Sequence, residues 1–108
     1  MKKLMFSSQE SLRVISSLDI IYCKSDNCYT SVFLKSGEEL IACKSLKRIA
    51  QELGSLTFIR VNQSYLINKD FIKSINKKSK IVELVNNQSI PFTVTLKDLL
   101  MNLDICIF

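Results

Sequence analysis

Short segments of alternating or continuous apolar residues repeat along this chain, and clusters of Ser, Asn, Asp and Gly separate them. Most of the segments are four to six residues long, which is typical of β-strands and too short for most helices. The polar clusters between them are typical of turns. The pattern predicts strands over residues 4–6, 12–15, 20–23, 29–34, 39–43, 58–61, 72–76, 80–85 and 89–92.

Two of the turns have the composition of tight hairpins, "KSGEE" at residues 35–39 and "VNNQS" at residues 85–89. Gly37 in the first turn, and either Asn86 or Asn87 in the second, can adopt the positive φ that such turns require. Strands joined in this way run antiparallel.

Helical spacing of apolar residues occurs in two segments, 45–54 and 95–103. Ser45 and Thr95 are in position to cap the two helices, and Gly54 directly follows the last apolar residue of the first. A short helical turn capped by Asn68 is also expected at 69–72. The fold class that follows is mainly β, with antiparallel sheets of short strands and two short α-helices. The inward-facing helical residues are expected to be Leu46, Ile49, Ala50, Leu53, Leu96, Leu99, Leu100 and Leu103.

The length of 108 residues suits a single domain spanning residues 1–108. Apolar residues make up 47% of the chain and charged residues 23%, as in an average globular protein. No apolar run approaches the roughly 18 to 20 residues that span a bilayer. Behind Lys2 and Lys3 the apolar patch is far shorter than the about 7 to 15 residues of a secretory signal. We therefore expect a cytoplasmic protein.

The four cysteines, Cys23, Cys28, Cys43 and Cys106, allow two interpretations. Four thiolates can bind zinc, but the chain has no C-x2-C pair and no His, and the usual zinc sites contain one or both. In a reducing compartment the cysteines remain thiols. We expect buried structural cysteines, with Cys28 the most exposed of the four.

The chain lacks the residues that most enzymes use. Without His it has neither the commonest general base nor the commonest metal ligand. Glycines at positions 37 and 54 alone cannot form a phosphate-binding loop or a nucleophile elbow. We expect no enzymatic activity, no metal, no cofactor and no small-molecule substrate.

Positive charge exceeds negative charge by five, with fifteen Lys and Arg against ten Asp and Glu. Such an excess favours polyanionic partners. Residues 69–80 concentrate it, with five lysines and one acid, Asp70. Taken alone, this run is equally well explained as a solvated surface.

The segment "FIRVNQSYLIN" at residues 58–68 places many polar groups inside an apolar region. Asn, Gln and Ser side chains can bind adenine edges or phosphate oxygens. The alternative is that Asn62 and Ser64 satisfy backbone groups of a turn and that Arg60 pairs with an acid. Composition alone does not decide between these two interpretations.

The longer segment "FIRVNQSYLINKDFIKSI" resembles the signature of the LytTR-type DNA-binding domain found in LytR/AgrA-like transcriptional regulators. Flanking segments are similar too, including "LDIIYCKSDNCYTSVFLKSGE", "SLKRIAQEL" and "IPFTVTLKDLLMNL". The resemblance covers residues 10–103 and keeps several motifs in the same order.

This resemblance implies a bacterial transcriptional regulator that binds double-stranded promoter DNA, often as a homodimer on direct repeats. Loops and a helix end of the family enter successive major grooves. The base contacts carried over from the family motifs are Lys24, Ser25, Asn27, Cys28, Asn62, Gln63, Thr95 and Lys97. The phosphate contacts, expected chiefly from charge, are Lys44, Lys47, Arg60, Ser64, Lys69, Lys77 and Lys78.

The chain departs from the family at the base-reading positions. Asn62 and Gln63 stand where the signature usually has His and a basic residue, and Val94 and Thr95 replace a frequent Arg. Bidentate Asn or Gln contacts to adenine would favour A·T-containing sites, although the same changes are also compatible with weak or lost specificity. Only about ten residues precede the resemblance, so we expect a stand-alone regulator without a receiver domain, or an excised domain.

Two other functions remain open. The apolar segment "LDICIF" at residues 103–108 could recruit a regulatory protein or a membrane-bound partner, although a closing strand or a homodimer contact would explain it as well. RNA binding is less favoured, because stacking on bases needs exposed aromatic residues and most aromatics here lie in apolar runs.

Overall fold

The computed structural model describes residues 2–7 and 9–103 and confirms the mainly β fold with two short helices. The helices are α1 (Leu46–Leu53) and α2 (Leu96–Met101), and short 3-10 turns lie at Ser17–Asp19 and Lys69–Phe71. The strands are β1 (Lys3–Ser7), β2 (Leu12–Ser16), β3 (Ile20–Asp26), β4 (Tyr29–Leu34), β5 (Glu39–Ala42), β6 (Phe58–Arg60), β7 (Tyr65–Asn68), β8 (Ile72–Asn76), β9 (Ile81–Leu84) and β10 (Ser89–Pro91).

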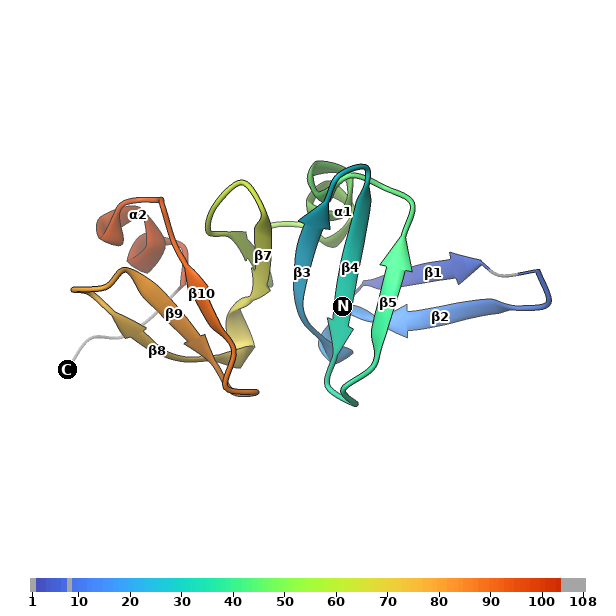
Figure 1. The fold of residues 1–108 in the computed structure, drawn as a ribbon, viewed down its shortest axis with the longest axis horizontal. Helices are drawn as coiled ribbons and strands as arrows, with labels where there is room; N and C mark the ends of the chain where they lie inside the picture. The colour runs from blue at the N-terminus through green and yellow to red at the C-terminus, as the bar shows by residue number, and fades with distance from the viewer. Residues whose placement is uncertain (1, 8, 104–108) are drawn as a thin grey trace.

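A five-stranded antiparallel sheet in the order β5-β4-β3-β7-β6 forms the centre of the molecule (Figure 1). In its middle strand, Cys23 lies opposite Val32 of β4 and Leu66 of β7. The remaining strands form a β1–β2 hairpin and a three-stranded sheet in the order β10-β9-β8. The turns have the expected chemistry, since Gly37 and Asn87 both have positive φ.

Two apolar clusters cover the two faces of the five-stranded sheet. The first cluster packs the sheet against α1 and the β1–β2 hairpin, and it includes Leu4, Ile15, Val32, Ile49 and Leu66. The second cluster packs the opposite face against the three-stranded sheet and α2, and it includes Tyr22, Ile67, Leu84, Ile90 and Leu99.

Both helices begin where their caps were expected. The Ser45 hydroxyl accepts a hydrogen bond from the backbone N–H of Arg48 at 3.2 Å, and α1 ends at Leu53, followed by Gly54 with a φ of +81°. The Thr95 hydroxyl accepts one from the N–H of Asp98 at 3.1 Å. Each cap satisfies one of the N–H groups that a helix leaves unpaired in its first turn.

Strand β7 was not predicted, because its sequence looked like the end of a polar loop. It lies between β3 and β6, so Leu66 enters the first cluster and Ile67 the second. Asn68 is only 1% exposed, yet its amide N–H donates to the Ile20 carbonyl at 3.0 Å and its oxygen accepts from the Asp70 N–H at 2.9 Å. These bonds offset the cost of burying a polar side chain, and the second of them caps the expected turn at Lys69–Phe71.

The cysteines divide differently from the prediction. Cys23 is buried in the first cluster, and burial raises the pKa of its thiol to about 12. Cys28 is exposed, as expected. The prediction that Cys43 is buried is wrong, because β5 ends at Ala42 and Cys43 lies in the exposed bend that follows. Cys106 and the rest of residues 104–108 lie outside the described residues.

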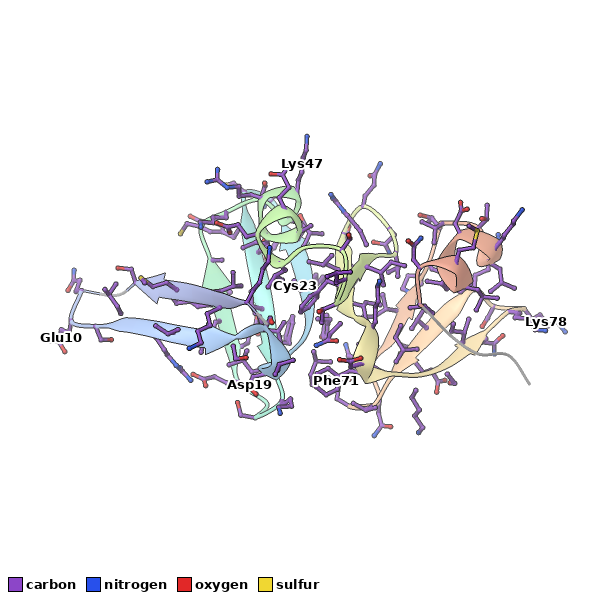
Figure 2. The ribbon with its side chains drawn as sticks, turned by 180° about the vertical axis from the view of Figure 1, so that it is seen from behind. Glu10, Asp19, Cys23, Lys47, Phe71 and Lys78 are labelled. Carbon is purple, nitrogen blue, oxygen red and sulfur yellow. The ribbon has the colours of Figure 1, made fainter. Side chains whose placement is uncertain are left out.

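The molecule is elongated, with principal extents of 49 × 26 × 24 Å. The β1–β2 hairpin projects at one end, and the turn between β8 and β9 lies at the other (Figure 1). Figure 2 shows this separation through Glu10 and Lys78, which mark opposite ends of the long axis.

Candidate nucleic-acid interface

The turn between β3 and β4 lies beside the loop between β6 and β7. The backbone N–H of Ser25 donates to the carbonyl of Ser64 at 2.8 Å, which joins the two segments directly. Asn27 occupies the turn with a φ of +56°, and both Asn27 and Cys28 are exposed to solvent. Two groups of predicted base contacts that are far apart in sequence therefore meet at one edge of the sheet.

The same loop also contacts the segment that leads into α2. The Thr93 N–H donates to the Val61 carbonyl at 2.9 Å, and the Asn62 side-chain amide donates to the Pro91 carbonyl at 2.6 Å. In Figure 1 the β3–β4 turn, the loop before β7 and the start of α2 follow one another along the upper edge. All three predicted base-reading segments are thus brought together.

Both polar groups of the Asn62 side chain already form hydrogen bonds within the protein. Its side-chain oxygen accepts from the N–H groups of Ser64 and Tyr65 at 2.7 and 2.9 Å, while its amide holds the Pro91 carbonyl. These contacts confirm the interpretation that Asn62 satisfies backbone groups of a turn. Arg60 donates to the Gln63 carbonyl at 2.7 Å, a backbone partner rather than the acid suggested as one alternative.

Gln63 differs from its neighbour, because its side chain is exposed and has no hydrogen-bond partner among the described residues. Its carboxamide keeps a free acceptor and free donors. Ser64 is exposed as well, and Lys97 is exposed in the first turn of α2. The Thr95 hydroxyl accepts from the Asp98 N–H and can still donate a hydrogen bond.

Lys24 lies over an aromatic ring at the edge of this surface. Its ammonium nitrogen is 5.8 Å from the centroid of Tyr65, the residue opposite it in β7. The Tyr65 ring in turn packs against Tyr22, with centroids 6.1 Å apart. A cation at this distance from a ring is attracted to its face, so the position of the Lys24 charge is restricted. Sequence analysis missed the role of Tyr65, because only the strand register places it opposite Lys24.

Lys44 and Lys47 flank the same edge. Lys44 follows β5, where its carbonyl accepts from the Thr30 hydroxyl at 2.7 Å and its ammonium group pairs with Glu52 at 2.8 Å. Lys47 lies in the first turn of α1, is exposed, and projects from the upper edge in Figure 2.

Three of the predicted phosphate contacts lie away from this edge. Lys69 follows β7 at the end opposite the loop, and its ammonium group donates to the Ser55 carbonyl at 2.8 Å. Lys77 and Lys78 are exposed in the turn between β8 and β9, at one end of the long axis (Figure 2). The structure does not bring these three lysines together with the base-reading segments.

Residues 10–103 match the family model described as the LytTr DNA-binding domain. The chain belongs to the LytTr DNA-binding domain family. The match covers nearly the whole chain and implies DNA binding by a bacterial regulator. Because the family is non-catalytic, it also confirms that the chain is not an enzyme.

A solved structure supports the fold of this LytTr domain. It is described as the LytTr DNA-binding domain of a methyl-accepting/DNA response regulator from Bacillus cereus. The two structures agree with a TM-score of 0.79 over 97% of this chain and 99% of that chain, at 16% sequence identity. At this identity the likeness shows a shared fold. No curated protein matches the chain.

Two further features of the LytTr domain concern membranes and metals. Among the described residues, no helix has the length and hydrophobicity to cross a bilayer. Residues 2–7 and 9–103 also contain no group of three or more His, Cys, Asp or Glu side chains arranged to hold a metal ion.

Proposed function

We propose that residues 1–108 form a single cytoplasmic domain that binds specific promoter sequences in double-stranded DNA as a transcriptional regulator. The observation that carries the proposal is the hydrogen-bonded edge formed by the β3–β4 turn, the loop before β7 and the start of α2. Protruding loops and a helix end of this kind can enter a major groove, where base edges are distinguishable. Flanking lysines would hold the register through phosphates.

Asn62 and Gln63 take different roles in this proposal. A bidentate contact to adenine needs both the oxygen and the amide of one side chain, and both groups of Asn62 already have partners inside the protein. Asn62 therefore positions the loop, and Gln63 reads the base. Lys24, Ser25, Asn27 and Cys28 would contact bases from the β3–β4 turn, and Thr95 and Lys97 from α2.

The proposed phosphate contacts fall into three sets, according to where they lie relative to the base-reading edge. Lys44, Lys47, Arg60 and Ser64 lie near the base-reading edge and would contact the adjacent backbone. Lys77 and Lys78 can reach DNA only if the duplex runs along the long axis of 49 Å, which corresponds to about 14 base pairs at about 3.4 Å each. Lys69 follows the far end of β7, where its ammonium group donates to the Ser55 carbonyl, and it would contribute least. A homodimer on direct repeats and a regulatory protein partner remain predictions of the sequence.

The test is selection from random duplex DNA at near-physiological salt, repeated with Gln63→Ala. We expect the native domain to select A·T-containing sites and the variant to lose about 1 to 3 kcal/mol of discrimination at one base position. Gln9→Ala is the matched control, since Gln9 is also exposed but lies at the tip of the β1–β2 hairpin. Selection of G-rich sites only, or equal effects of the two variants, would refute the assignment of Gln63.

A further inference from the structure

The β1–β2 hairpin has an apolar outer face that no other segment of the described residues covers. Neighbouring residues of a strand point to opposite faces, and Leu4 and Ile15 point inward, where they are buried in the first cluster. On the other face, Met5 and Val14 lie opposite each other and are 62% and 54% exposed. Leu12, two residues from Val14 on the same strand, is 65% exposed. Three large apolar side chains therefore lie together on the outer face.

This outer face is accessible because the hairpin projects from the rest of the molecule. The hairpin extends past β5 (Figure 1), and Glu10 marks its tip at one end of the long axis (Figure 2). Neither Leu4 nor Ile15, the buried residues of the two strands, lies on the outer face. A second molecule can therefore contact this face without disturbing the core.

Opposite charges lie at the two ends of the outer face. Lys3 is exposed at the start of β1 and points outward with Met5, because the two residues are two positions apart in one strand. Glu10 is exposed at the tip. Neither charge has an ion-pair partner among residues 2–7 and 9–103. A face that is positive at one end, apolar in the middle and negative at the other end is complementary to a reversed copy of itself.

We infer that the outer face of the hairpin binds the same face of a second copy of this chain, with the two hairpins stacked and pointing in opposite directions. Met5, Leu12 and Val14 of the two copies would cover one another, and Lys3 of each copy would meet Glu10 of the other. Hairpins pointing in the same direction would instead place like charges together, which repel. The charges therefore select the orientation, and burial of apolar surface stabilises the dimer.

The small size of the face predicts a weak dimer. The hairpin has five residue pairs, and at about 3.3 Å per residue with strands about 4.8 Å apart its face measures about 16 by 10 Å. It would bury far less than the roughly 800 Å² per partner of a stable interface, so the two copies should associate reversibly at high concentration. This two-fold dimer does not depend on DNA binding, and it differs from a homodimer on direct repeats, whose copies are related by translation.

The test measures self-association of the full chain without DNA by sedimentation velocity, from micromolar to millimolar protein. We expect reversible dimers. Val14→Asp should weaken the dimer by at least about tenfold, because by symmetry it removes two apolar contacts and adds two charges to the interface. Val85→Asp is the matched control, since Val85 is 52% exposed but follows β9 in the three-stranded sheet; we expect less than about a twofold change.

Charge reversal tests the orientation of the two hairpins. Lys3→Glu lowers the net charge of +5 by two, which by itself favours nonspecific association. In the proposed dimer it turns two attractive pairs into repulsive ones, so we expect association to weaken by about fivefold. Glu10→Lys should weaken it similarly. The double variant restores both pairs, as does an equimolar mixture of the two single variants, and both should recover association.

Three results would overturn the inference. A protein that stays monomeric at millimolar concentration would leave the outer face to another occupant. Equal weakening by Val14→Asp and Val85→Asp would place the contact outside the hairpin, and unchanged or stronger association of Lys3→Glu would exclude the reversed orientation. Urea denaturation checks that each variant folds, and the charge variants test the inference independently of Val14→Asp. Because no DNA is present, none of these outcomes bears on the proposed DNA-binding function.

Discussion

The two faces of the five-stranded sheet are closed to different degrees. On one face, the three-stranded sheet and α2 bury Ile67, Val82, Leu84, Ile90 and Leu99 to 1% exposure or less. On the other face, α1 and the β1–β2 hairpin leave a cleft beside β1 and β5, and Met5 and Val14 of the hairpin are exposed. The difference lies at the margin of the open face, because Cys23 and Val32 at its centre are also 0% exposed.

The difference follows from what covers each face. Only Leu4 of β1 and Ile15 of β2 are buried against the sheet, so the hairpin contributes little core. An exposed ion pair between Arg13 of β2 and Glu38 ties the hairpin to the turn before β5, and such pairs add little stability. The loop between β6 and β7, which we propose reads bases, is held to the closed side by hydrogen bonds from Thr93 N–H to Val61 and from Asn62 to the Pro91 carbonyl.

The largest expected effect is a loss of stability when a cavity is made in the core of the closed face. Leu99→Ala removes a fully buried side chain from α2 and should lower the free energy of unfolding by about 2 to 5 kcal/mol, measured by urea denaturation. Ile49→Ala on the open face should cost less, near the lower end of that range, because Ile49 already borders the cleft. Met101→Ala, at a site 70% exposed on the same helix as Leu99, is the control. A larger loss for Ile49→Ala than for Leu99→Ala would contradict the comparison.

An intermediate effect, on both stability and DNA affinity, is expected when the loop between β6 and β7 loses its hydrogen bonds to the closed side. Asn62→Ala removes the acceptor for two backbone N–H groups and the donor to Pro91, which should cost about 1 to 3 kcal/mol of stability. DNA affinity should fall on every sequence, because the loop loses its shape. Asn86→Ala, which removes a single acceptor in an exposed turn, is the control. Loss of base discrimination with unchanged stability would show instead that Asn62 reads a base.

The smallest expected effect is on the salt dependence of DNA affinity, which reports which lysines contact phosphates. Lys44→Ala should reduce the steepness of the log-log dependence of affinity on salt by about one unit, because one phosphate contact is lost. Lys69→Ala should leave that dependence unchanged, since Lys69 lies at the far end of β7. Affinities measured at several salt concentrations distinguish the two. If both variants reduced the salt dependence equally, the DNA would have to pass the end of β7 where Lys69 lies.

Local patterns were sufficient for most of the fold. The apolar periodicities, the serine and threonine caps and the hairpin turns each depend on residues a few positions apart, and α1 begins after Ser45 as expected. Strand β7 was missed because its polar flanks looked like a loop, and only pairing on both sides makes Asn68 a buried strand residue. Cys43 was assigned to a strand that stops one residue earlier, and strand ends are decided by the partner strand.

The sequence by itself determined the strand-rich class, the helix positions and the family signature, because these depend on the order of neighbouring residues. Only the tertiary structure decided that Ser25 meets Ser64 and that Val61 meets Thr93. It also decided that the Asn62 side chain bonds to the backbone, whereas the Gln63 side chain has no hydrogen-bond partner among residues 2–7 and 9–103. The cleft beside β5 also belongs to this second group. Such contacts join segments that are remote along the chain, and their partners are chosen by strand order and register.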